Sequence, residues 1–357
     1  MRLFDGMSDR MRAILMRTAA AFLGVALLTV VLLSTDLSEV GTHLSRVGWG
    51  VVLMIAAYQL AFALDSWAWL MTVRSLPGRA IWVWRLWLVR MVGEAVNNAT
   101  PFAGMGGEPV KAAILNRTWG IGYGEGLASI VLSRTTFLIG LVPFLLIGFA
   151  LLLAEPAVET SFKWAAGTGL VGLCAGIAAF FAIQRLGLTS RTGGSFARLL
   201  DRPGLGRLFE TIGEFETRLN EFYAHARLRF SATVLLSFLN WTLGALEIWI
   251  AFELLGAPVT FAEAWIIEAV VQLVRVVVFF IPLSLGTQEG AFVLVVGALT
   301  GNPALGVAAA VLRRFRELAV LGAGLLMGPL VFGRGALSPA PEKAAGTERE
   351  DTTGNPS

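Results

Sequence analysis

The sequence contains few of the residues from which soluble enzymes build metal sites and catalytic centres. It has one cysteine, Cys174, which excludes a disulfide framework and a metal site made of several cysteines. Its two histidines, His43 and His225, both lie in connecting segments, so a histidine-based metal or nucleophile site is not expected. Neither a Walker A motif nor an Asp-x-Asp metal motif occurs in the sequence. We therefore expect no cofactor and no metal.

Charged residues are also scarce. They make up 15% of the 357 residues, against about 25% in soluble domains. Hydrophobic residues make up 56%, and the mean hydropathy is +0.71. Apolar runs long enough to cross a bilayer recur along most of the chain. The sequence therefore predicts an all-α membrane protein, a polytopic helical bundle.

The basic residues do not indicate nucleic-acid binding, although the net charge is +3. The arginines cluster in short segments between apolar runs, as the positive-inside rule describes for cytoplasmic loops. The segment 185–229 has eight arginines and five acidic residues, and it predicts a cytoplasmic loop. Arginine-rich ends at both termini predict that the N- and C-termini are also cytoplasmic, in the inner (plasma) membrane of a bacterium.

The predicted organisation has a basic N-terminus (1–17), a transmembrane domain (18–334) and a disordered tail (335–357). The run 18–34 is interpreted as an uncleaved first transmembrane helix, because no small-x-small cleavage site follows it. A short polar stretch then leads to Gly50. About six full spans are predicted, at 18–34, 51–73, 127–154, 164–183, 230–255 and 305–332.

Two further apolar segments are interrupted by proline and glycine. The first, 81–96, runs into a break that includes Pro101, and a short amphipathic helix at 109–117 follows. The second, 261–281, breaks at Pro282. Because such sequences cannot continue a helix, we expect each segment to form a broken or re-entrant helical hairpin. The break residues are Asn97, Asn98, Pro101, Gly106, Gly107, Pro282, Gly286 and Gln288.

The two breaks have similar spacing. Pro101 precedes Glu108 by seven residues, and Pro282 precedes Glu289 by seven. An arginine follows early in the next long span in each half. The charge pattern places the two breaks on opposite sides of the membrane. This predicts two inverted repeats, an arrangement of secondary transporters in which interrupted helices form the substrate site.

Charged residues inside lipid need partners, because each costs roughly 2.5–3.5 kcal/mol on insertion scales, and they are often functional. One interpretation is structural, with ion pairs joining Glu108 to Arg134 and Glu289 to Arg314. The other is that an arginine faces a lipid phosphate, aided by backbone N–H groups at Gly106–Gly107 and Gly286–Thr287. The candidate headgroup ligands are Arg134, Arg275, Arg313 and Arg314, with Glu108 and Glu289 as orienting or proton-carrying acids. Asp65 and Glu247 are expected to be structural.

The two breaks resemble the transmembrane, flippase-like domain of the lysylphosphatidylglycerol synthases, over about residues 15–332. The resemblance rests on Asn97-Asn98-Ala99-Thr100-Pro101, Gly107-Glu108-Pro109-Val110-Lys111 and Ile281-Pro282-Leu283-Ser284-Leu285-Gly286-Thr287-Gln288-Glu289, with Arg313 and Arg314 after them. That family has stand-alone bacterial members, some of them associated with hopanoid lipid genes. This sequence departs from the family pattern at Thr287-Gln288 and in the extra glycines of the first break.

The resemblance implies a flippase-like protein that binds a (phospho)lipid and translocates it between leaflets, with membrane lipids as partners. The aminoacyl-transfer domain of the synthases has no counterpart here, so an enzyme activity is not expected. Two alternatives stay open. One is a non-transporting accessory of a lipid-biosynthesis enzyme, and the other is a membrane-embedded lipid-modifying enzyme. A homo-oligomer is compatible with either.

Overall fold

The computed structural model describes residues 29–30, 33, 36–99, 106–185, 227–278, 281 and 284–333. Several predictions lie outside these residues: the basic N-terminus, most of the 18–34 span, most of the 185–229 loop, the tail, and the break residues Pro101 and Pro282. Within the described ranges every regular element is helical. The all-α class predicted from the sequence is thus confirmed.

The described chain forms one short 3-10 helix and ten α-helices, with bounds that follow the predicted spans closely. They are α2 (Leu37–Val47), η1 (Gly48–Gly50), α3 (Val51–Thr72), α4 (Ala80–Ala99), α5 (Gly107–Trp119), α6 (Tyr123–Ala154), α7 (Thr160–Arg185), α10 (Arg227–Leu254), α11 (Phe261–Val277), α12 (Thr287–Thr300) and α13 (Pro303–Phe332). Five helical stretches are long and apolar enough to cross a membrane. They contain α3, α6, α7, α10 and α13 and match the five predicted full spans that the described residues cover.

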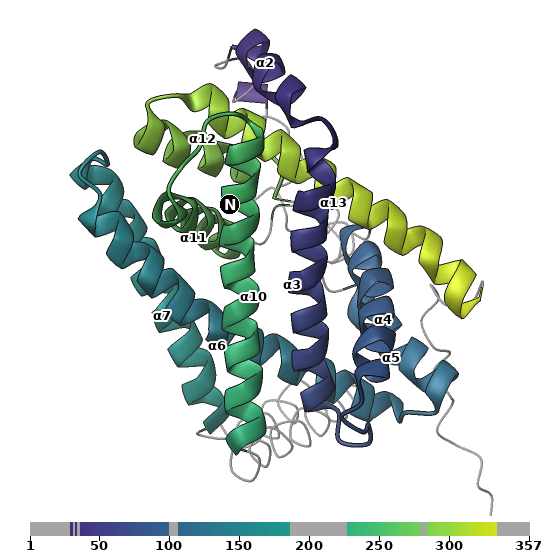
Figure 1. The fold of residues 1–357 in the computed structure, drawn as a ribbon. Coiled ribbons are helices and arrows are strands. Elements are labelled where there is room, and N and C mark those ends of the chain that lie inside the picture. The colour runs from purple at the N-terminus through teal and green to yellow at the C-terminus, as the bar shows by residue number, and fades with distance from the viewer. Residues whose placement is uncertain are drawn as a thin grey trace, which may run out of the picture.

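Helices α3 and α10 run side by side through the middle of the bundle (Figure 1). They are antiparallel, because Gly50, which directly precedes α3, lies against Leu254 at the end of α10. The remaining helices pack around this pair, with α4 against α13 and α11 against α6. The α3–α10 pair therefore provides the scaffold on which both broken hairpins are placed.

The first hairpin, α4 and α5, begins and ends beside the C-terminal end of α3. Near its two ends, the rings of Trp82 and Trp119 lie 5.5 Å apart. Ser75, in the α3–α4 connection, donates its backbone N–H to Glu125 at the start of α6 over 3.0 Å. Because both ends of the hairpin share one side, it has the geometry of a re-entrant segment.

The second hairpin, α11 and α12, has its two ends at the opposite end of α3. The short polar stretch before Gly50 forms α2 there. His43 of α2 lies 3.2 Å from the carbonyl oxygen of Leu255, which precedes α11. Asn302, just after α12, donates to Glu39 of α2 over 2.6 Å. The two hairpins thus enter the bundle from opposite ends, while a two-fold relation between the halves stays a prediction.

Candidate functional site

The first hairpin carries a network of two acids and two cations. Arg134 of α6 donates through Nη2 to Glu94 of α4 over 2.5 Å and to Glu108 of α5 over 2.9 Å. Lys111 of α5 donates to the same two carboxylates over 3.1 and 3.2 Å. The predicted Glu108–Arg134 ion pair is confirmed. Because two carboxylates face two cations, the charge of this network is balanced within the bundle.

Asn97 joins the two arms of the first hairpin. Its side-chain oxygen accepts the backbone N–H of Gly107, the first residue of α5, over 2.6 Å. Its amide nitrogen donates to Glu94 and Glu108 over 3.3 Å each. Since Asn97 already binds the N–H of Gly107, the prediction of a free anion-binding N–H at that residue is wrong. Asn98, by contrast, is exposed.

Helix α5 is more buried than predicted. We expected an amphipathic helix at 109–117, but residues 110–115 are all buried. Lys111 itself is buried, since its chain passes close to Gly93 of α4 and its ammonium reaches Glu94 and Glu108. Within this helix only Asn116, Arg117 and Thr118, near its end, are exposed. The helix is therefore an internal part of the bundle.

Substitution of Gly107 with alanine is expected to lower the stability of the hairpin. A Cβ at this residue would meet the backbone carbonyl of Gly93 and the side-chain oxygen of Asn97, and backbone cannot move aside easily. Overpacking of this kind costs about 1–3 kcal/mol. The measurement is thermal unfolding of the purified protein in detergent. Gly124→Ala is the matched control, because a Cβ there meets nothing within 4 Å, and an equal Tm for both variants would contradict the close α4–α5 contact.

The second hairpin carries the larger network. Arg313 of α13 donates to both oxygens of Glu268 on α11, over 2.6 and 2.9 Å. Arg314 donates to Glu289 of α12 over 2.5 Å and to Glu317 over 2.8 Å. The predicted Glu289–Arg314 pair is therefore confirmed. Arg313, predicted as a headgroup ligand, has a guanidinium that is already engaged by Glu268.

Glu289 also caps the N-terminus of α12. Its second oxygen accepts the backbone N–H of Gly286 over 2.8 Å, and Gly286 has a φ of 75°, which favours glycine. The prediction that this N–H is available to an anion is thus wrong as well. Gln288 is fully buried, and its side-chain oxygen has no hydrogen-bond partner among the described residues.

The two networks have corresponding parts. Arg134 lies 11 residues after the first residue of α6, and Arg314 lies 11 after the first residue of α13. Each binds a glutamate in the first turn of the preceding short helix. Asp65 and Glu247 each lie seven residues before the end of α3 and α10, respectively. Asp65 pairs with Arg90, and Glu247 pairs with Arg316 over 3.3 Å, as a structural interpretation of these acids predicts.

Arg275 breaks this correspondence. It lies 14 residues after the first residue of α11. The residue at the same distance from the first residue of α4 is an acid, Glu94. Arg275 is half-buried and makes no ion pair with any residue in the described ranges, although Glu317 and Glu268 lie within electrostatic range. The other three predicted headgroup arginines all bind carboxylates. Arg275 is thus the one predicted ligand whose guanidinium is not bound by an acid among the residues that the structure describes.

Two aromatic residues of α3 lie between the networks. The guanidinium of Arg316 lies 3.8 Å from the ring centre of Tyr58, and that of Arg90 lies 4.7 Å from Phe62. The two rings are 5.5 Å apart. Tyr58 is also within electrostatic range of Glu94 and Glu247, one acid from each half. The charged residues of both halves therefore meet along one face of α3.

Sequence reasoning missed several members of these networks. Glu94, Lys111, Glu268, Arg316 and Glu317 were not candidates, although all are charged residues within apolar segments. Helical spacing was a usable signal for some of them. Glu94 lies three residues before Asn97, and Glu268 lies four before Gln272, which donates to it over 2.7 Å.

Comparisons with known proteins agree with this architecture. Residues 18–324 match the family described as the lysylphosphatidylglycerol synthase TM region. A relative named UPF0104 membrane protein, from Methanothermobacter thermautotrophicus, is 22% identical over 314 residues, which cover 82% of this chain and 88% of that protein. No solved structure matches the chain. Since the family match spans both broken hairpins, the chain is an integral, multi-pass membrane protein that belongs to the lysylphosphatidylglycerol synthase TM region family.

Proposed function

We propose that this protein binds the phosphate of a membrane phospholipid beside the second hairpin and translocates the lipid between leaflets. The proposal rests on one observation: the guanidinium of Arg275 is half-buried and makes no ion pair with any described residue. A cation in lipid costs about 2.5–3.5 kcal/mol unless it is compensated. A phospholipid phosphate would compensate it, and guanidinium matches phosphate geometry in a bidentate manner that lysine cannot reproduce.

The paired arginines have a supporting part in this proposal. Arg134 is 36% exposed although it binds Glu94 and Glu108, whereas Arg313 is 4% exposed. Arg134 can therefore contact a headgroup while its ion pairs with Glu94 and Glu108 stay intact. Arg313 instead holds α11 against α13 through its ion pair with Glu268. Glu108 and Glu289 orient Arg134 and Arg314, and either acid is a candidate proton carrier if transport is ion-coupled.

The placement of the hairpins supports translocation as well as binding. They enter the bundle from opposite ends of α3, and one charged residue from each half, Arg90 of α4 and Arg316 of α13, lies against Phe62 and Tyr58 of that helix. In secondary transporters, interrupted helices that enter from opposite sides form a site that each side reaches in turn. We propose the same alternating access here, with the Arg74–Arg79 end of α3 facing the cytoplasm. Transport, not lipid modification, is the activity that this arrangement favours.

The test is the leaflet distribution of fluorescent lipids in liposomes containing the purified protein. Fluorescent phosphatidylglycerol and phosphatidylethanolamine are compared with fluorescent glucosylceramide, which has no phosphate. The proposal predicts that the protein accelerates transfer of both phospholipids over protein-free liposomes and leaves the glycolipid nearly unchanged. Equal rates with and without folded protein would rule out translocation, and equal acceleration of all three lipids would rule out phosphate recognition.

A further inference from the structure

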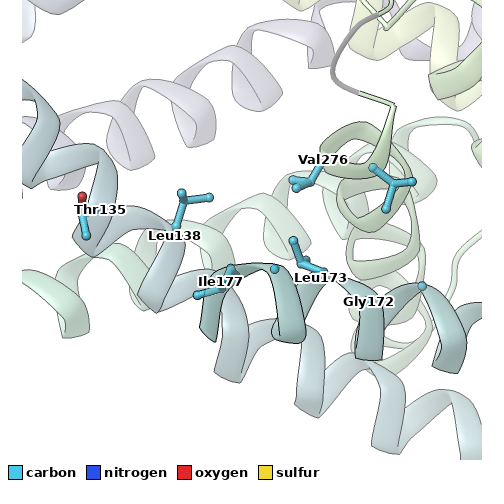
Figure 2. A pocket seen from close by; sticks show the side chains of 9 residues that line it. Thr135, Leu138, Gly172, Leu173, Ile177 and Val276 are labelled. Atoms are coloured by element: carbon cyan, nitrogen blue, oxygen red, sulfur yellow. The ribbon is translucent and has the colours of Figure 1, made fainter. Parts of the chain in front are cut away.

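An apolar cavity lies next to the proposed headgroup site, between α6, α7 and α11. It has a volume of about 520 Å³, within the usual range of ligand sites, about 300–1,000 Å³. Figure 2 shows Leu138, Leu173 and Val276 directed toward this space from the three helices. The lining residues are Thr135, Leu138, Gly169, Gly172, Leu173, Gly176, Ile177, Val276 and Val277.

We infer that this cavity holds one acyl chain of the lipid whose phosphate binds at Arg275, an inference that rests on the proposed function. The cavity offers nothing to a polar ligand. Its lining has one polar side chain, Thr135, whose hydroxyl donates to the carbonyl of Val131 in its own helix over 2.9 Å. Water needs about two to four polar partners in such a site, so an apolar occupant is favoured.

The depth of the cavity fits an acyl chain. Gly169 lies nine residues from the first residue of α7 and Ile177 lies eight from the last. At ~1.5 Å per residue, the cavity therefore lies ~12–14 Å from either end of this membrane-spanning helix, in the hydrocarbon region. Gly172, Gly176 and Val277 are exposed at its edge, so surrounding lipid can enter it.

Two residues that line the cavity directly follow arginines assigned to the headgroup. Its α6 wall begins at Thr135, directly after Arg134, and its α11 wall begins at Val276, directly after Arg275. Successive Cα atoms are ~3.8 Å apart, so each wall starts beside an arginine assigned to the headgroup. A lipid with its phosphate at Arg275 would thus have apolar space for a chain at the same end of α11.

The other apolar occupant that could be considered is a helix of a second copy of this chain. The Gly172-x-x-x-Gly176 pattern alone would suit a helix contact. In this structure, however, a Cβ at Gly172 or Gly176 meets nothing within 4 Å, and these glycines instead leave the cavity open.

The test uses phosphatidylglycerol that carries a diazirine at the end of one acyl chain, in liposomes containing the full-length protein. After irradiation, labelled peptides are mapped by mass spectrometry. We expect labelling within 169–177 and at Val276 or Val277, reduced at least fivefold by Gly172→Leu or Gly176→Leu. Gly322→Leu is the matched control, since Gly322 is also a transmembrane-helix glycine with nothing within 4 Å of its Cβ, and it should leave the labelling unchanged.

The outcomes separate this inference from the proposed function. Transport without cavity labelling, or labelling that Gly172→Leu leaves unchanged, overturns the acyl-chain site and leaves translocation standing. Labelling that depends on Gly172, in a wild-type protein that moves no lipid, supports the acyl-chain site and overturns translocation. A change of oligomeric state in Gly172→Leu, seen by light scattering and without cavity labelling, would assign this face to a second copy and overturn the inference.

Discussion

Replacement of Glu268 by alanine is expected to destabilise the protein by about 3–5 kcal/mol, because it leaves a buried guanidinium without its acid. Arg313 is 4% exposed and donates two hydrogen bonds to Glu268, which is 1% exposed. Gln272 also loses its acceptor. The free energy of unfolding can be measured by denaturant titration in mixed micelles. A loss below about 1 kcal/mol would show that Arg313 finds another partner.

The matched control for this variant removes both charges. Glu268→Leu combined with Arg313→Met replaces the ion pair with apolar side chains of similar size. Such replacements are often neutral or stabilising, so the double variant should be clearly more stable than Glu268→Ala. If both variants are equally destabilised, the loss comes from packing at Glu268 and not from an uncompensated charge.

Substitution of Arg275 by glutamine is expected to lower the initial rate of phospholipid transfer by about 10–150-fold. A hydrogen bond to a charged group contributes about 1.5–3 kcal/mol, and each 1.4 kcal/mol corresponds to a factor of ten. Because Arg275 makes no ion pair in the described part of the chain, its removal leaves no acid that has lost a direct partner. The Tm should therefore change little. The measurement is leaflet distribution in liposomes with equal amounts of folded protein.

Two further variants test whether the effect is specific to the guanidinium of Arg275. Arg275→Lys keeps the charge but loses the bidentate geometry, so an intermediate rate is expected. Arg227→Gln removes an exposed arginine at the start of α10, and it should transfer lipid at the wild-type rate. A large fall in Tm for Arg275→Gln, matched by an equal loss of activity, would mean that Arg275 stabilises the fold instead of binding lipid.

Much of the fold could be predicted from the sequence because the bilayer restricts the choices. Long apolar runs must be helices, so the spans containing α3, α6, α7, α10 and α13 were identifiable. The pairs Glu108–Arg134 and Glu289–Arg314 were predictable for a similar reason. Each joins a short helix to the long helix that follows it, so the chain itself brings the two residues close.

The rest of the site depends on contacts that the chain order does not determine. Whether Glu94 faces Arg134 or lipid depends on the rotation of α4 about its axis, and α4 carries few charges to indicate that rotation. Glu268 of α11 pairs with Arg313 of α13, although the two residues are 45 positions apart in the sequence. The N–H groups of Gly107 and Gly286 were expected to be free, yet Asn97 and Glu289 bind them, because polar side chains near an interrupted helix satisfy its first N–H groups.

The central claim, that Arg275 holds a lipid phosphate within the bundle, is tested most directly by lipid retention in native mass spectrometry. The purified protein is delipidated and then offered phosphatidylglycerol and glucosylceramide at equal concentration. We predict that the wild type retains phosphatidylglycerol preferentially and that Arg275→Gln loses this preference while Arg227→Gln keeps it. Equal preference in the wild type and Arg275→Gln would contradict the claim.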